Sequence, residues 1–308
     1  MILCCGEALI DMIPARTVGG AEGYVPHAGG AIFNTAIGLG RLGVRTGMLT
    51  GLSRDQFGRQ LAEALAASHV DVSQVVTSDR PTTLAFVRLT DGHATYTFYD
   101  ENSAGRMVAI GDIPALSDEV SALYFGGISL ACEPGADAYA ALLAREGAGR
   151  AVMLDPNIRP GFIQDVEHYR ARLERMIAGA DIVKVSDEDL NWILPAPVSL
   201  TEKVAKLAEM GPSVVILTRG GDGATGYMAG GREVHVPAQK VEITDTVGAG
   251  DTFNAGFLAK LSELGALRKD SLSTLSDETL RQALAHGARV AAITVTRAGA
   301  NPPWAEEL

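Results

Sequence analysis

The sequence predicts an α/β fold of three layers, doubly wound around a mainly parallel sheet. Short apolar, β-branched runs alternate along the chain with longer amphipathic segments. Strands that alternate with helices imply right-handed crossovers, with helices on both faces of a parallel sheet. The chain has 308 residues, 47% of them apolar, and can therefore bury a large core. Because no long linker or low-complexity segment interrupts it, we expect a single domain over residues 1–308.

The first part of the chain predicts strands and then helices in alternation. Residues 1–13 (MILCCGEALIDMI) are typical of one or two buried strands. Residues 31–43 predict a helix, because apolar side chains recur there at three- and four-residue steps. A strand is expected over residues 45–53 and a second helix over residues 55–70.

Residues 82–101 interrupt this alternation. Two β-rich runs flank the dipeptide Asp91-Gly92, which is a strong signal for a hairpin turn. Together with residues 12–26, this hairpin predicts a small β lid beside the main sheet.

The alternation then resumes to the end of the chain. In parallel sheets ligands bind beyond the carboxyl ends of the strands, where we expect Asp11, Gly127, Asp155, Ser186 and Thr218. The predicted strands cover residues 121–130, 151–157, 180–186, 213–218 and 240–243. The predicted helices cover residues 136–149, 166–180 and 200–211, a segment that starts near residue 251, and residues 280–300.

Composition narrows the possible partners. The formal net charge of −11 disfavours nucleic acid or an anionic membrane as a partner. The N-terminus has no basic segment, and no apolar stretch reaches the roughly 18–20 residues of a membrane helix. The three cysteines show no metal-binding spacing, and we expect buried thiols and a cytoplasmic protein.

A glycine-rich loop that opens a helix carries the main chemical signal. Gly248, Ala249 and Gly250 are small enough for their backbone N–H groups to line up at the start of that helix. These N–H groups lack helical partners and lie at the positive end of the helix dipole, so they form an anion site. Asp251 is then either a carboxylate placed at a helix N-terminus or a base. The helix dipole predicts a lowered pKa for Asp251 and an ionised carboxylate at neutral pH.

A second glycine pattern matches a nucleotide-binding motif but lacks the structural context of that motif. Residues 221–226 (GDGATG) match the dinucleotide fingerprint, but that fingerprint must open a helix. Here a strand-like segment follows, so we predict a tight strand–turn–strand connection and disfavour a nicotinamide dehydrogenase. The sequence contains no Walker phosphate loop.

Two segments resemble the signatures of the ribokinase-like (PfkB) carbohydrate kinases. Residues 245–258 (DTVGAGDTFNAGFL) match every position of the C-terminal signature of that family. Residues 28–36 (AGGAIFNTA) resemble its N-terminal signature, with Ile32 where proline is frequent. The resemblance extends over essentially the whole chain and implies a ribokinase-like fold and phosphoryl transfer from ATP to a sugar hydroxyl.

The resemblance assigns roles to individual residues. It implies that Asp251 is the general base and that Gly248, Ala249 and Gly250 form the hole for the transferred phosphoryl group. The residues implied for sugar binding are Asp11, Gly29, Gly30 and Asn34, with Tyr96 and Phe98 from the lid. The residues implied for ATP contact are Thr218, Gly220 and Gly223, with Ala288, Ala291 and Ala292 as a wall for adenine; tight core packing explains these alanines equally well.

Metal and phosphate contacts are implied by two further motifs. Asn157 and Arg159 are expected to point into the cleft, where Arg159 would brace a phosphate or an anionic substrate group. Ser186 and Asp189 stand where many relatives carry Asn-x-x-Glu on the nucleotide side, linked to Mg²⁺ through water. A solvated helix start is the alternative explanation of this acidic run. Some relatives hold K⁺ on carbonyls near the position of Asp245, which the sequence leaves open.

Within the family, residues 94–107 and 124–134 look most like fructokinases, with Ser103 and Ala104 supporting the sugar site. The alternatives are 2-keto-3-deoxygluconate, ribose or a nucleoside as the acceptor. An acidic sugar would need a cation such as Arg88 or Arg106. A binding protein that kept the fold without activity is the rival from another class. The resemblance also implies a homodimer formed through the lid.

Overall fold

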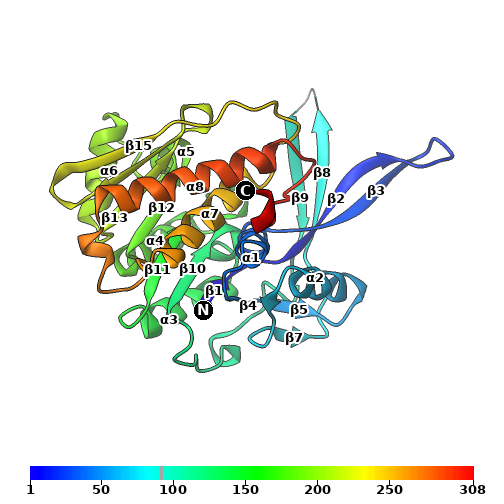
Figure 1. The fold of residues 1–308 in the computed structure, drawn as a ribbon. Helices are drawn as coiled ribbons and strands as arrows, with labels where there is room; N and C mark the ends of the chain where they lie inside the picture. Colours follow the sequence, from blue (N-terminus) through cyan, green and yellow to red (C-terminus); the bar gives the residue numbers. More distant parts are fainter. Residues whose placement is uncertain (91–92) are drawn as a thin grey trace.

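A nine-stranded sheet forms the centre of the computed structural model, which describes residues 1–90 and 93–308 and side chains outside 88–96 (Figure 1). Seven neighbouring strands are parallel, and the last two are antiparallel. The order is β6 (Val70–Asp71), β4 (Thr46–Leu49), β1 (Ile2–Cys5), β10 (Ala122–Gly126), β11 (Ala151–Asp155), β12 (Ile182–Ser186), β13 (Val214–Thr218), β14 (Ala224–Met228) and β15 (Arg232–Val236).

Helices cover both faces of this sheet. On one face, Ile2 and Cys4 pack into a core with the first set of helices; on the other, Leu3 and Cys5 pack into a separate core with the second set. The first set is α1 (Ala31–Arg41), α2 (Gln56–Ala67), α7 (Ala249–Glu263) and α8 (Asp277–Val295); the second is α3 (Gly135–Glu146), α4 (Val166–Gly179), α5 (Asp187–Ile193) and α6 (Leu200–Glu209). Central strands buried on both faces are typical of doubly wound α/β proteins. The predicted three-layer fold is confirmed.

A separate four-stranded sheet stands at one end of the molecule (Figure 1). Its order is β3 (Glu22–Gly29), β2 (Leu9–Arg16), β8 (Leu84–Thr90) and β9 (His93–Tyr99). The segments that the sequence indicates for a lid therefore pair with one another, and β8 and β9 are antiparallel. The turn Asp91-Gly92 lies outside the described residues. A two-stranded sheet of β5 (Gly51–Ser53) and β7 (Val76–Ser78) lies beside α2.

Short 3₁₀ turns join several elements. They are Ile110–Asp112, Gly127–Leu130, Pro160–Phe162, Gly220–Asp222, Ala229–Gly231, Leu272–Thr274 and Ala305–Glu307. Among the described helices, none combines the length and the apolarity that crossing a bilayer requires.

The glycine pattern at 221–226 forms a turn between antiparallel strands, as predicted. Gly223 adopts φ +97°, and a Cβ there would lie 2.2 Å from the Val236 carbonyl oxygen, so the turn requires glycine. The strand predicted for residues 240–243 is wrong: the segment is irregular, and Ile243 is 63% exposed. The backbone beyond it is held by Val295 at the end of α8, which accepts hydrogen bonds from the Thr244 and Asp245 N–H groups.

Candidate active site

The predicted polar residues gather at the carboxyl end of the parallel strands. Asp155, Ser186 and Thr218 are the last residues of β11, β12 and β13, and Gly127 follows β10 directly. Asp11 is the exception, because it lies within β2 and therefore reaches the site from the lid sheet.

Asp251 lies in the first turn of α7 and is 9% exposed. The Asn34 side-chain amide, from α1, donates a hydrogen bond of 2.9 Å to Asp251 Oδ2. The structure thus brings together residues from the two signature segments. Asn34, predicted as a sugar ligand, contacts the predicted base directly.

The pKa of Asp251 departs from the sequence prediction. Burial raises it from 3.8 to about 7; the Asn34 hydrogen bond and the Lys184 charge lower it, and Asp155 and Glu7 raise it further. The loss of hydration therefore outweighs the helix dipole, and the expected lowering is wrong. A carboxylate that titrates near neutral pH is suited to general base catalysis.

The loop before Asp251 has the features of an anion site. Gly248 adopts φ +77°, and a Cβ there would lie 2.4 Å from the Ala300 Cβ, so only glycine fits. The Ala249 N–H donates to the Thr246 carbonyl over 3.3 Å. Of the predicted loop donors, the Ala249 N–H is thus engaged, whereas within the described chain the N–H groups of Gly248, Gly250 and Asp251 find no hydrogen-bond acceptor. Three donors at the start of α7 are therefore available to a phosphoryl group.

A buried polar network lies beneath this loop, and sequence reasoning missed it. Asp155 Oδ2 accepts hydrogen bonds from Lys184 Nζ at 3.0 Å and from Asn254 Nδ2 at 2.7 Å. Asn254 Nδ2 also donates to the Tyr124 hydroxyl at 2.8 Å. A signal was present in the sequence, because a lysine within the apolar strand Ile182–Ser186 needs a buried partner.

Paired glycines shape the sugar side of the site. A Cβ on Gly29 would lie 2.2 Å from Asp11 Oδ2, so this glycine makes room for the carboxylate. Burial raises the pKa of Asp11 to about 6. Gly30 adopts φ +109° above the carbonyl of Glu7, whose side chain accepts hydrogen bonds from the Ala31 and Ser129 N–H groups. Glu7 thereby fixes the start of α1 and was not predicted.

The lid contributes through its inner face. Asp11 pairs with Ala85, and Ala85 pairs with Phe98, so the three residues share one face of the sheet. The Phe98 ring packs edge to face on Phe162, with centroids 4.2 Å apart. The side chain of Tyr96 lies outside the described part of the chain.

Arg159 does not contact the buried site. It is exposed, and its Nη1 donates to the carbonyls of Asn157 and Ile158 at 3.4 and 3.1 Å. Asn157 itself is half-buried and adopts φ +42°. In this structure the Arg159 guanidinium hydrogen-bonds its own loop through Nη1, and its role in the cleft stays a prediction.

Asp189 is a structural carboxylate. Its Oδ1 accepts from the Ile158 N–H at 2.7 Å, and its Oδ2 accepts from the Ser186 N–H and hydroxyl at 3.1 and 2.8 Å. At 6% exposed it is not part of a solvated helix start. With both oxygens engaged, direct binding of Mg²⁺ by Asp189 does not fit, and the described residues contain no group of three side chains that could hold a metal.

The nucleotide side is formed by small residues. Thr218 ends β13, and its hydroxyl donates to the Val185 carbonyl over 3.4 Å. Gly220 adopts φ +46° with open space around it. Ala292 is 6% exposed and belongs to the core, whereas Ala288 and Ala291 are only partly buried.

Asp245 stabilises the loops around α7. Its two oxygens accept from the Val247 and Gly299 N–H groups at 3.0 and 2.8 Å.

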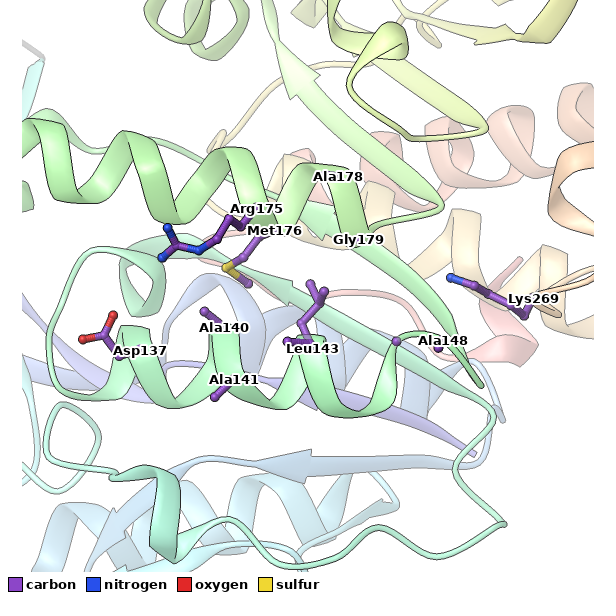
Figure 2. Close-up of a pocket in the computed structure, with 12 residues that line it drawn as sticks. Asp137, Ala140, Ala141, Leu143, Ala148, Arg175, Met176, Ala178, Gly179 and Lys269 are labelled. Atoms are coloured by element: carbon purple, nitrogen blue, oxygen red, sulfur yellow. The ribbon is translucent and has the colours of Figure 1, made fainter.

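Two cavities differ in their position relative to this site. A cavity of about 540 Å³ lies between α3 and α4, lined by Ala140, Met176 and Arg175 among others (Figure 2). It contains none of the predicted residues and lies near the opposite end of the strands. A cavity of about 20 Å³ near Glu7 includes Arg106, which pairs with Asp100 at 3.0 Å and donates to the Glu133 carbonyl.

Comparisons with known proteins agree with this geometry. The sequence profile described as pfkB family carbohydrate kinase matches residues 1–307. A fructokinase of Rhizobium leguminosarum bv. trifolii is 51% identical over 281 residues, covering 91% of this chain and 86% of that protein.

Solved structures are also similar. The crystal structure of fructokinase from Xylella fastidiosa with bound ATP has a TM-score of 0.86 at 27% identity, covering 97% of this chain and 93% of that one. Fructokinase from Vibrio cholerae O395 in its fructose, ADP and calcium-bound form has a TM-score of 0.85 at 27% identity, with 97% and 94% covered. With the profile matched from the first strand to the last turn, this chain belongs to the pfkB family of carbohydrate kinases.

Proposed function

We propose that this kinase transfers the γ-phosphoryl group of ATP to a hydroxyl of fructose. The observation that carries the chemistry is Asp251, a buried carboxylate beside three N–H groups at the start of α7 that find no acceptor in the described chain. The choice of fructose is supported by the 51% identical relative, which is a fructokinase.

Each part of the site has a distinct task in this mechanism. The carboxylate of Asp251 takes the proton of the acceptor hydroxyl as the sugar oxygen forms its bond to the γ-phosphorus. The bond from that phosphorus to the bridging oxygen of ADP breaks in the same displacement. The N–H groups of Gly248, Gly250 and Asp251 stabilise the charge on the transferred group. Asn34 holds Asp251 in place while the lid residue Asp11 binds sugar hydroxyls.

Cations would complement this arrangement. Mg²⁺ bound to ATP would neutralise phosphate charge, and its contact with the chain would run through water, because Asp189 is already hydrogen-bonded. A monovalent cation such as K⁺ would bind carbonyls of the loops that Asp245 joins.

A neutral sugar fits better than an acidic one. Arg106, a candidate partner for a sugar carboxylate, is paired with Asp100, and its side chain is 16% exposed. Its positive charge is therefore already compensated. Arg88 has a side chain outside the described residues and is not part of this argument.

The experiment is a steady-state panel with ATP and four acceptors: fructose, 2-keto-3-deoxygluconate, ribose and a nucleoside. We expect fructose to have the highest kcat/KM, by about 10-fold or more. A higher value for another acceptor would overturn the choice of fructose. Absence of transfer to every acceptor, with ATP still bound, would favour a binding protein instead.

We also propose a homodimer through the outer face of the lid and a cytoplasmic location. Tyr24 and Tyr99 are 50% and 58% exposed, and each packs edge to face on Phe86. Exposed aromatic clusters of this kind mark protein interfaces. Sedimentation of a Tyr99→Glu variant should give a monomer where the wild type gives a dimer; an unchanged mass would contradict this interface.

The proposed cytoplasmic location has separate support. The free, buried thiols Cys4, Cys5 and Cys132 agree with a reducing compartment.

A further inference from the structure

The ammonium of the buried lysine Lys184 lies close to the Gly248–Gly250 loop. A Cβ on Gly250 would meet the Lys184 ammonium at 3.4 Å; apart from the two chain neighbours and the nearby backbone of α7, no other heavy atom of the described residues lies within 4 Å of it. Lys184 is 5% exposed and comes from β12, a different element from the loop. A cation from a neighbouring strand thus lies next to the loop, although the loop itself contains no lysine.

The charge of Lys184 is maintained by Asp155. The Nζ–Oδ2 distance is 3.0 Å, and Asp155 is 2% exposed. Burial lowers the pKa of Lys184, but the charges of Asp155 and Asp189 outweigh this and raise it, so the side chain is an ammonium at neutral pH. Asp155 is the hydrogen-bond partner found for this ammonium, which has three donors in all.

We propose that Lys184 is a positioning residue for phosphoryl transfer, whose ammonium supplies positive charge beneath the Gly250 loop and favours the ionised form of Asp251. This proposal rests on the proposed function and adds a residue to its mechanism. In a P-loop enzyme the loop's own lysine supplies such a charge. Here a neighbouring strand supplies it, and the loop residue can remain glycine.

The charges around Asp251 explain why Lys184 matters. The groups that act on its carboxylate are Asn34 from α1, Glu7 from the segment between β1 and β2, Asp155 from β11 and Lys184 from β12. Tyr124 from β10 also interacts with it, as a neutral phenol. Two of these groups are anionic and one is cationic, so Lys184 opposes the charges that would keep Asp251 protonated.

The test compares three variants with the wild type. Lys184→Met removes the charge at nearly constant length. Lys203→Met is the matched control, because Lys203 is also 5% exposed but bonds Asn191 on the α5–α6 side, away from the loop. The double variant Lys184→Met/Asp155→Asn removes both members of the ion pair, so it leaves no unpaired buried charge and is the variant to use if the single one fails to fold.

The measurements are kcat, KM for ATP and sugar, and the pH profile of kcat. We expect Lys184→Met to lower kcat by about 10-fold or more, with the sugar KM nearly unchanged. Its acid limb should move to higher pH by about one unit. The double variant should restore the acid limb, because one opposing anion is also gone, but not kcat. Lys203→Met should match the wild type in all readouts.

Either of two outcomes would overturn the proposal. One is a folded Lys184→Met enzyme whose pH profile and kcat coincide with those of the wild type. The other is a double variant that recovers full kcat. The comparison is made on whichever acceptor the wild type phosphorylates, so a wrong choice of fructose is separated from a wrong role for Lys184.

Discussion

Replacing Asp251 by asparagine should separate activity from stability. The amide oxygen of asparagine still accepts the hydrogen bond from Asn34, so the local packing is preserved. The base is lost, and we expect kcat to fall by about 10²–10⁴-fold. The free energy of unfolding should move in the opposite direction, because the folded state no longer contains a buried carboxylate.

The size of the stability gain follows from the pKa. Burial raises the pKa of Asp251 from 3.8 to about 7, and each unit corresponds to about 1.4 kcal/mol, so the ionised carboxylate costs at most about 4 kcal/mol. Relaxation and water entry reduce this, and we expect about 1–3 kcal/mol. The raised pKa means that the folded state binds the proton more tightly. The cost is therefore absent below about pH 4, grows up to about pH 7 and stays constant above it.

Urea unfolding of both proteins at pH 5 and pH 8.5 measures this difference. The variant should be more stable than the wild type, and by a clearly larger margin at pH 8.5. A variant that is less stable at both pH values, or more stable by an equal margin, would show that burial does not raise the pKa of Asp251. The reasoning about its role as a base would then lose its physical support.

Other substitutions test the geometry around the site. Gly29→Ala places a methyl group against the Asp11 carboxylate, so we expect the KM for sugar to rise by about 10-fold or more while the KM for ATP stays constant. Gly111→Ala is the control, because there is open space around Gly111. Equal effects of Gly29→Ala on both KM values would argue against Asp11 as a sugar ligand. Gly248→Ala forces an alanine to adopt φ +77°, which should lower the free energy of unfolding by about 1–2 kcal/mol and also lower kcat. A fully active variant would show that the loop tolerates displacement. The pH profile of wild-type kcat/KM should have an acid limb near the Asp251 pKa of about 7, with activity rising as the carboxylate ionises, and a limb near pH 4 would contradict the effect of burial.

The sequence predicted those parts of the molecule that depend on local pattern. The alternation of strands and helices, the β lid segments and the glycine turn at 221–226 follow from periodicity and turn residues. The Gly248–Gly250 loop could be recognised because a site made of backbone leaves small residues in the sequence. The strand predicted at 240–243 failed because a short alternation of polar and apolar residues does not reveal whether a partner strand is available.

The properties that depend on burial could not be predicted. The dipole of α7 is a local feature, but the hydration of Asp251 is lost only in the folded protein, where α7 packs against other elements such as α1, so the pKa prediction had the wrong sign. The same holds for Asp189, whose two oxygens are taken by Ser186 and by the distant Ile158 N–H. The proposed role of Lys184 depends on the proximity of its ammonium to the start of α7, which no local pattern encodes.

The hydrogen bond between Asn34 and Asp251 joins residues 217 positions apart. While the chain emerges from the ribosome, α1 and the lid strands are therefore available long before the helix that completes the site. Until α7 and α8 arrive, one face of the sheet is covered by α1 and α2 alone, without two of its four helices. Contacts of such long sequence separation form slowly, and the uncovered face is open to aggregation during synthesis. It follows that a chain terminated before α7 would both lack the base and expose the part of the core that α7 and α8 bury, so incomplete products would be targets for chaperones and proteases.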